Sequence, residues 1–148
     1  MDINKTLNEL FVNLFRNINT IEEKAIRTED YLDVTANDIH VMEAIGVDQA
    51  KNMSAVAKVL SVTMGTLTIS VNTLVKKGYV DRVRSEEDRR VVLISLSERG
   101  MRAFFHHQKF HEEMIEAVVS ELNEEEKLIL GKALDNLNAF FTKKNKEC

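Results

Sequence analysis

The fold of this chain is decided by the stretch 53-MSAVAKVLSVTMGTLTISVNTLVKKGYVDRVRSEEDRRVVLISL-96. Apolar residues recur there at three- and four-residue intervals and predict two short helices, over 53–60 and 64–77. The second is capped by Thr63 and closed by a glycine after two lysines. Two β-rich runs follow over 79–84 and 91–96, and the six polar residues between them suit a hairpin loop. Two helices and a hairpin in this order predict a winged helix-turn-helix.

Helices are predicted on both sides of this stretch, so the fold class is mainly α with a small β-hairpin wing. The first covers about 3–27. The next covers 36–45, with a Thr35 cap, Asp38 at its N3 position and Gly46 at its end. A further helix covers 98–122 after a Ser97 cap, and a last helix begins at Asn123 and Glu126, which resemble a capping box.

The helices at the two ends are too long for a core set by the small central module. A second copy of the chain is the economical partner for their apolar stripes, and an intrachain bundle is the alternative. We therefore predict one domain, 1–148, in which 36–100 form the winged helix-turn-helix lobe and 1–30 and 103–148 are the dimerisation helices of a homodimer.

Composition predicts a globular protein of the cytoplasm. The 148 residues are 44% hydrophobic and 30% charged, enough for one domain with a core. No run approaches the roughly 20 apolar residues that cross a bilayer, and Met1 to Lys5 lacks the pattern of a secretion signal. Cys148 is the single cysteine and has no internal partner for a disulfide, as expected in a reduced compartment.

The net charge of −4 hides an asymmetry. Residues 53–102 carry nine Lys or Arg against five Asp or Glu, a net +4, which leaves −8 for the rest of the chain. A basic centre between acidic arms is a modest electrostatic footprint for a phosphate-bearing partner, and a solvated charged surface would give a similar pattern.

The second helix of the central stretch has two contrasting faces. At 100° per residue Leu67, Val71 and Leu74 point inward, whereas Ile69 lies on the other side. An outward isoleucine on a small polar face suits a DNA major groove, where apolar groups touch thymine methyls, although a surface helix with one stray apolar residue is the simpler alternative. In the preceding helix we expect Val56, Val59 and Leu60 to face inward.

The hairpin carries four arginines, Arg82, Arg84, Arg89 and Arg90. A narrow A·T-rich minor groove attracts such side chains because its potential is strongly negative. We expect Asp88 to orient Arg90 across the loop, the alternative being surface ion pairs of little energetic value. The predicted DNA contacts are Ser54, Thr63, Gly65, Thr66, Thr68, Ile69, Asn72, Thr73, Arg82, Arg84, Asp88, Arg89 and Arg90.

Three motifs resemble the signature of the multiple-antibiotic-resistance regulator (MarR) family of transcriptional regulators. They are Leu74-Val75-Lys76-Lys77-Gly78-Tyr79-Val80, Asp88-Arg89-Arg90 and Leu96-Ser97-Glu98-Arg99-Gly100. The resemblance implies a homodimeric winged helix whose Asp-x-Arg wing motif corresponds to Asp88 and Arg90. Because the chain shows no Gly-rich phosphate loop, nucleophile–base pairing or metalloprotease motif, we predict that it is not an enzyme.

Within that family, the runs 63–68, 82–92 and 110–114 are similar to the Firmicute repressors of fatty-acid biosynthesis. This resemblance implies a repressor that takes acyl chains on acyl carrier protein as corepressor and holds the chain in an apolar tunnel near the dimer helices. The candidate lining residues are Phe11, Phe15, Phe104, Phe105, Phe110 and Met114, and ordinary core packing is the alternative for each of them. Ile69 departs from the polar residue expected there in that branch.

Two further interpretations stay open. His107 and His111 are four residues apart on one helical face, and His40 with Glu22 or Glu23 is able to approach them, an arrangement similar to that of zinc-sensing members of the family. The alternative metal set is therefore His40, His107, His111 and Glu23, although such histidines more often serve packing. A pure protein-interaction module is the other interpretation.

Overall fold

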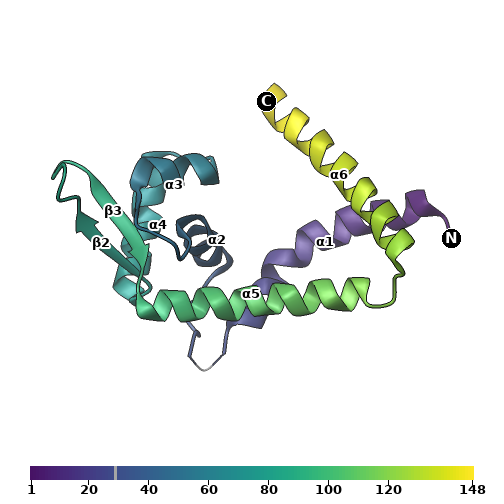
Figure 1. Ribbon diagram of the computed structural model, residues 1–148, viewed down its shortest axis with the longest axis horizontal. Coiled ribbons are helices and arrows are strands. Elements are labelled where there is room, and N and C mark those ends of the chain that lie inside the picture. Colours follow the sequence, from purple (N-terminus) through teal and green to yellow (C-terminus); the bar gives the residue numbers. More distant parts are fainter. Residues whose placement is uncertain (29) are drawn as a thin grey trace. The chain divides into compact units, whose positions relative to one another are not determined.

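The computed structural model describes residues 1–28 and 30–148, and for Phe15 it describes the backbone only. Its elements in chain order are α1 (Ile3–Ile26), α2 (Ala36–Ile45), β1 (Lys51–Asn52), α3 (Met53–Leu60), α4 (Met64–Lys77), β2 (Val80–Arg84), β3 (Val92–Leu96), α5 (Glu98–Val119) and α6 (Glu124–Glu147) (Figure 1). The chain divides into two compact units, Met1–Phe110 and His111–Cys148, and α5 runs through the division. The mainly helical winged helix-turn-helix is confirmed.

Short polar side chains begin the helices where the sequence predicts. Thr35 and Asp38 form a complete capping box at the start of α2, and Asn123 and Glu126 form another at the start of α6. The Oγ1 atom of Thr63 accepts from the backbone N–H of Thr66 at 3.1 Å and so caps α4. These bonds satisfy N–H groups that have no partner inside the helix, and each cap is worth about 1 kcal/mol.

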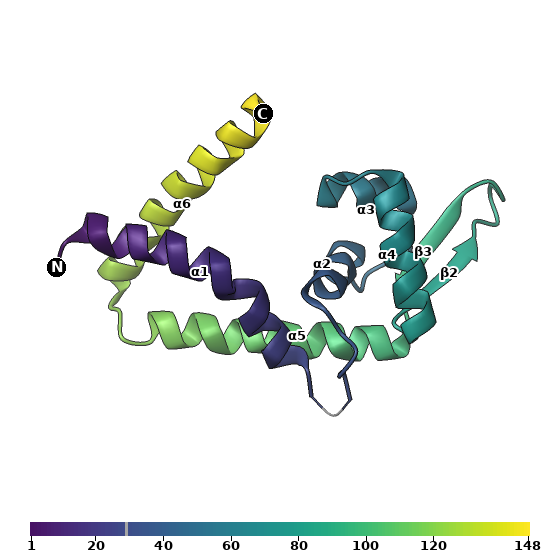
Figure 2. The ribbon, with the colours of Figure 1, turned by 180° about the vertical axis from the view of Figure 1, so that it is seen from behind.

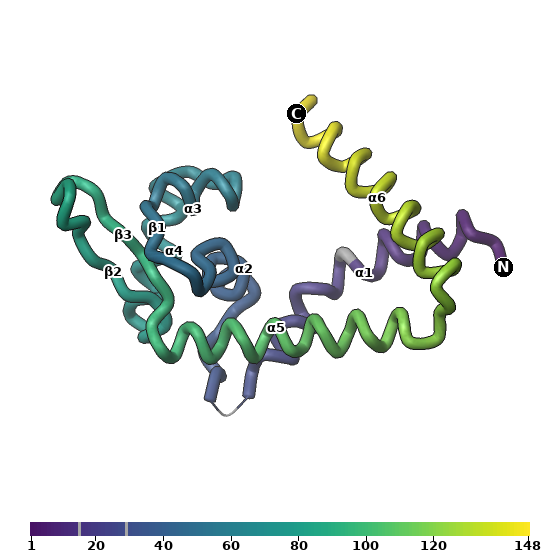
Figure 3. Tube along the Cα trace, viewed as in Figure 1, coloured from purple at the N-terminus to yellow at the C-terminus, as the bar shows by residue number. Residues whose placement is uncertain are grey.

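The wing belongs to a three-stranded antiparallel sheet in the order β1-β3-β2. In the hairpin Val80 pairs with Leu96 and Arg84 with Val92. The short strand β1 was not predicted, because two residues are too few to show an alternating pattern. It pairs with the other edge of β3 and joins the start of α3 to the wing (Figure 3).

The core of the first unit lies between α2, α3, α4 and the base of the sheet (Figure 2). Leu67, Val71 and Leu74 are buried, as predicted for the inward face of α4. The prediction for Val59 was wrong, because its side chain is 69% exposed. Its neighbours Val56 and Ala57 are buried, which centres the inward face of α3 about 100° away from Val59.

The glycine that ends α4 and the serine that precedes α5 meet where α4, β2 and α5 come together. Gly78 ends α4 with a φ of +83°, a conformation that glycine adopts without strain. The Ser97 hydroxyl donates to the carbonyl of Gly78 at 2.6 Å, and the Ser97 amide donates to the carbonyl of Tyr79 at 2.9 Å. Ser97 Oγ also accepts from the amide of Gly100 at 3.1 Å and so caps the start of α5. Ser97 therefore connects the start of α5 to the carbonyls that follow α4.

In the second unit no described residue of α6 is buried. Its exposed large apolar side chains are Leu128, Ile129, Leu134, Phe140 and Phe141. In the first unit α1 likewise exposes Ile3, Leu7, Leu10, Leu14 and Ile21. Across the described residues no single helix has the length and apolar character to cross a membrane, and α3 and α4 meet that test only together, with a bend of 106° between them.

Gly100→Ala should destabilise the first unit. A Cβ atom at this position would overlap the carbonyl oxygen of Tyr79, a backbone atom that already accepts from the Ser97 amide, and such overpacking costs about 1 to 3 kcal/mol. Gly65→Ala is the matched control, since its Cβ would meet Thr63 Oγ1 at an ordinary 3.9 Å. Thermal unfolding followed by circular dichroism should show a lower melting temperature for Gly100→Ala only. Equal melting temperatures for the two variants would contradict this close packing.

Candidate nucleic-acid interface

The outward face of α4 carries the predicted contacts. Ile69 is 71% exposed, which confirms its predicted orientation away from the core. Gly65, Thr66, Asn72 and Thr73 are exposed beside it. This face therefore combines one large apolar side chain with small polar ones.

Threonine hydroxyls that donate to backbone carbonyls give the outward face of α4 a more methyl-rich surface than its sequence indicates. The hydroxyl of Thr68 donates to the carbonyl of Met64 at 2.7 Å, and that of Thr73 donates to the carbonyl of Ile69 at 3.1 Å. Each hydroxyl hydrogen is thereby used within the helix, which leaves the oxygen as an acceptor and the methyl group for outside contacts.

The tip of the wing is held by Asp88. Its carboxylate accepts from the Arg90 backbone amide at 3.1 Å and from the Arg90 guanidinium at 3.1 Å (Nε) and 3.3 Å (Nη2). The side-chain bond from Arg90, and then its amide, hold the pKa of Asp88 below its usual value. The Arg90 side chain is 91% exposed, so the wing presents a guanidinium whose direction is set before any partner arrives.

Arg84 also stabilises the loop at the tip of the wing. Its Nη1 donates to the carbonyl of Arg89 at 2.9 Å, while Ser85 and Val91 close the loop through a backbone bond of 2.8 Å. Arg84, predicted as a DNA contact, thus has a structural bond within the wing. Arg82 and Arg89 are exposed.

A hollow of about 490 Å³ separates the wing from the two helices. Four predicted contact residues line it: Ser54 at the start of α3, Thr68 on α4, and Arg82 and Arg90 on the wing. Met53 and Met64 are also on its wall. The helix-turn-helix and the wing thus form one concave surface in the first unit.

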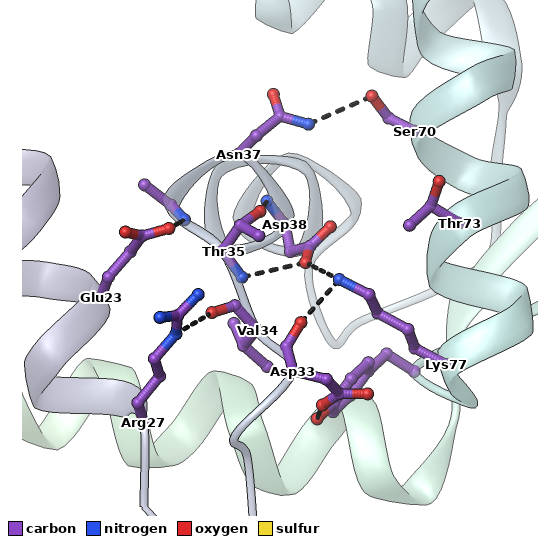
Figure 4. A network of polar contacts seen from close by, with 12 residues as sticks. Glu23, Arg27, Asp33, Val34, Thr35, Asn37, Asp38, Ser70, Thr73 and Lys77 are labelled. Atoms are coloured by element: carbon purple, nitrogen blue, oxygen red, sulfur yellow. Dashed lines mark hydrogen bonds and ion pairs between the residues drawn. The ribbon is translucent and has the colours of Figure 1, made fainter.

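The carboxy-terminal end of α4 is tied to the start of α2. The Lys77 ammonium donates to the Asp38 carboxylate at 2.7 Å and to the backbone carbonyl of Asp33 at 2.6 Å (Figure 4). Asp38 is buried, with 4% of its side chain exposed, and its Oδ2 also accepts from the Thr35 amide at 3.0 Å. Half-way along α4, the hydroxyl oxygen of Ser70 accepts from the side-chain Nδ2 of Asn37 at 3.2 Å.

Arg99 and Tyr79 complete this arrangement. The Arg99 guanidinium donates to the carbonyl of Lys77 at 2.9 Å and lies 4.5 Å from the ring centroid of Tyr79, a cation–π distance. The hydroxyl of Tyr79 donates to Asp33 at 2.7 Å. Burial, and then the bond to Asp33, raise the pKa of the Tyr79 phenol well above its usual value, while Arg99 acts in the opposite direction. We call Asp33, Asp38, Lys77, Tyr79 and Arg99 the α4 anchor.

The sequence patterns do not indicate the α4 anchor. Lys77 was recognised only as part of a helix end and of a family motif. Tyr79 and Arg99 were recognised within family motifs, and Asp38 as part of a helix cap. Lys77 is 39 residues away from Asp38 in sequence, so no periodic pattern connects them. The two lysines before the capping glycine were already explained as a helix end, so Lys77 gave no separate signal.

The predicted ligand residues lie in different environments. Phe104 is partly buried against the core, and Phe105, edge-on to it at 5.5 Å, is 51% exposed. Phe11 and Phe110 are half-buried and Met114, in the second unit, is exposed. The side chain of Phe15 lies outside the described residues.

The predicted metal residues are only partly brought together. His40 is half-exposed and lies 3.6 Å from Glu43. Glu23 accepts from the amide of Ala36 at 2.8 Å, so its carboxylate serves the start of α2. Glu22, rather than Glu23, is the buried carboxylate whose oxygen comes within 4.8 Å of a ring nitrogen of His107. His107 is buried too, and its Nε2 lies 3.0 Å from a Glu43 oxygen.

A helix-turn-helix with an oriented basic wing defines a class of DNA-binding transcriptional regulators, and comparisons with known proteins agree. A family model described as "Transcriptional regulator SarA/Rot" matches residues 24–107. The multiple antibiotic resistance protein MarR of Escherichia coli K12 is 34% identical over 103 residues, which are 65% of this chain and 72% of that protein. SarZ of Staphylococcus haemolyticus is 36% identical over 69 residues, 47% of each chain.

Among solved structures, that of Streptococcus pneumoniae FabT in complex with DNA has a TM-score of 0.85 and 38% identity to this chain, and covers 95% of this chain and 98% of that one. The chain belongs to the MarR/SarA family of winged-helix, DNA-binding transcriptional regulators, which confirms the resemblance of its motifs. The members found are regulators of transcription and not enzymes.

Proposed function

We propose that two copies of this chain bind one pseudo-palindromic, A·T-rich operator and repress transcription. The observation that carries this proposal is the concave surface on which α4 and the Arg90 wing lie together. In the proposed complex Thr66 and Ile69 enter the major groove, where methyl groups meet thymine, and Arg90 enters the adjacent minor groove. Ser54, Thr63, Gly65, Thr68, Asn72, Thr73, Arg82, Arg84, Asp88 and Arg89 complete the interface or support it.

The homodimer is supported by the apolar side chains that one chain leaves exposed. Those on α1 recur at three-, four- and seven-residue intervals, as expected of a face that packs against other helices, and α6 leaves further large apolar side chains exposed. Patches of this kind on a single chain mark interaction surfaces. We assign residues 1–30 and 103–148 to dimerisation and 36–100 to DNA binding. A two-fold dimer places two wings and two α4 helices on half-sites about one helical turn apart.

Arg90→Ala should weaken operator affinity about 5- to 150-fold, on the order of 1 to 3 kcal/mol, while folding and dimerisation stay intact. The loss follows from removing a preset guanidinium from a narrow groove. Fluorescence anisotropy with an operator selected from random A·T-rich duplexes measures it, and footprinting should protect two half-sites.

Arg102→Ala is the matched control, because it removes the same charge from an exposed side chain on α5 that pairs with Glu98. Equal affinities for the two variants, or protection of a single half-site, would count against the proposed complex. Absence of salt-sensitive binding to any duplex would favour a protein-interaction module instead.

For the effector we propose a long acyl chain carried by acyl carrier protein, acting as corepressor on genes of fatty-acid biosynthesis. The support is the similarity to the Firmicute repressors of fatty-acid biosynthesis, the likeness to S. pneumoniae FabT and the aromatic side chains of α5 that are not fully buried. An acyl chain near these residues would shift the relative populations of the dimer's DNA-binding geometries.

A zinc-responsive regulator is the second candidate function. It is favoured by the buried pair Glu22 and His107, with His111 one helical turn further along α5. Carboxylate and imidazole groups are ordinary zinc ligands. The Glu43 carboxylate near His107 gives that imidazole a partner without metal.

The two effectors make opposite predictions for operator binding. With an acyl effector, long-chain acyl carrier protein should tighten binding, the unacylated carrier should not, and EDTA should have no effect. With a zinc effector, EDTA should change affinity and added zinc should restore it. Gel shifts of untagged protein, with metal analysis of the same sample, separate these outcomes. An effect of zinc and none of the acylated carrier would overturn the acyl proposal.

A further inference from the structure

Polar contacts connect α1 to α4 through the start of α2. At one end Glu23 of α1 accepts from the Ala36 amide at 2.8 Å, and Arg27 donates to the carbonyl of Val34 at 3.0 Å. At the other end Asp38 binds the Lys77 ammonium at 2.7 Å. Figure 4 shows both ends meeting at the first turn of α2.

The start of α2 is well suited to connect them. Its first N–H groups have no partner inside the helix and carry a partial positive charge, so they favour the carboxylates of Glu23 and Asp38. Asp38 is buried, which makes its charge dependent on Lys77: a buried carboxylate without its cation is strongly unfavourable. A change in the position of α1 would therefore be transmitted to α4 through these bonds as well as through the apolar core that Ile26 of α1 shares with Leu74 of α4.

The contacts of Lys77 fit a role in connecting α2 to α4 better than a role in binding DNA. Its Nζ is occupied by two acceptors within 2.7 Å, and only 22% of the side chain is exposed. Its neighbour Lys76 is exposed on the same turn. A phosphate contact by Lys77 would require breaking both bonds.

We propose that Lys77, Asp38 and Glu23 are positioning residues that fix the orientation of α4 relative to α1, and thereby the spacing of half-sites that the homodimer accepts. This inference rests on the proposed function, because half-site spacing exists only for a dimer on an operator. Residues that couple sites without touching the ligand typically change affinities by up to about 30-fold.

The test is Lys77→Met, a substitution of similar length, with Lys76→Met as the matched control. Affinities are measured on the selected operator and on versions with one base pair fewer or one more between the half-sites, each base pair turning the half-sites by about 35°. Wild type and Lys76→Met should both prefer the native spacing. Lys77→Met should bind it about 3- to 30-fold more weakly and lose most of the preference.

The dependence of affinity on salt concentration is measured for the same three proteins. If Lys77 positions α4, the slope for Lys77→Met equals that of wild type. A slope lower by about one would show that Lys77 contacts a phosphate and would overturn the proposal. A variant that binds every operator more weakly with the preference unchanged would also overturn it, since that is the effect of general destabilisation.

Asp38→Asn keeps the size of the side chain and its cap oxygen but removes the charge, so it gives the same test if Lys77→Met folds poorly. Glu23→Leu, at the α1 end of the path, removes the acceptor of the Ala36 amide and should weaken the spacing preference in the same direction. A Glu23→Leu protein with the wild-type preference would overturn the connection to α1. Failure of wild type to bind any duplex would overturn the proposed function and this inference with it, an outcome distinct from a change confined to the variants.

Discussion

The ion pair between Lys77 and Asp38 is the interaction on which the geometry of the proposed reading surface depends. Each partner restricts the other: the buried Asp38 carboxylate needs a cation, and the Lys77 ammonium is held by that carboxylate and the Asp33 carbonyl. Arg99 adds a bond to the carbonyl at the end of α4. The helix is thus fixed at its carboxy-terminal end, while its opposite face, with Ile69, stays exposed.

On the wing and on α4 alike, hydrogen bonds within the chain fix the side chains of the proposed reading surface. On the wing, Asp88 holds the guanidinium of Arg90, and on α4, Thr68 and Thr73 use their hydroxyl hydrogens within the helix. A surface that is ordered before binding loses less conformational entropy when it meets a partner. Its methyl groups and arginines are suited to reading the shape and thymine content of a duplex more than a unique pattern of hydrogen bonds.

Local signals predicted most of the fold. The caps at Thr35 and Thr63, the glycine after α4 and the spacing of Leu67, Val71 and Leu74 depend on neighbours within a few residues, and all are confirmed. Sequence failed where tertiary contacts decide: Val59 lies at the edge of a narrow buried face, and β1 is stabilised only by its pairing with β3. The α4 anchor joins residues far apart along the chain, and for the same reason the sequence did not indicate that Glu22, rather than Glu23, lies beside His107.

Amide hydrogen exchange at the end of α4 tests most directly whether the α4 anchor holds this helix. The Gly78 and Tyr79 amides donate to carbonyls of the last turn of α4, those of Val75 and Leu74. We predict that both exchange only through global unfolding, as slowly as the amide of the buried Val71. Exchange at Gly78 and Tyr79 as fast as at the exposed wing residue Arg90, with Val71 still protected, would show a fraying helix end and contradict the account.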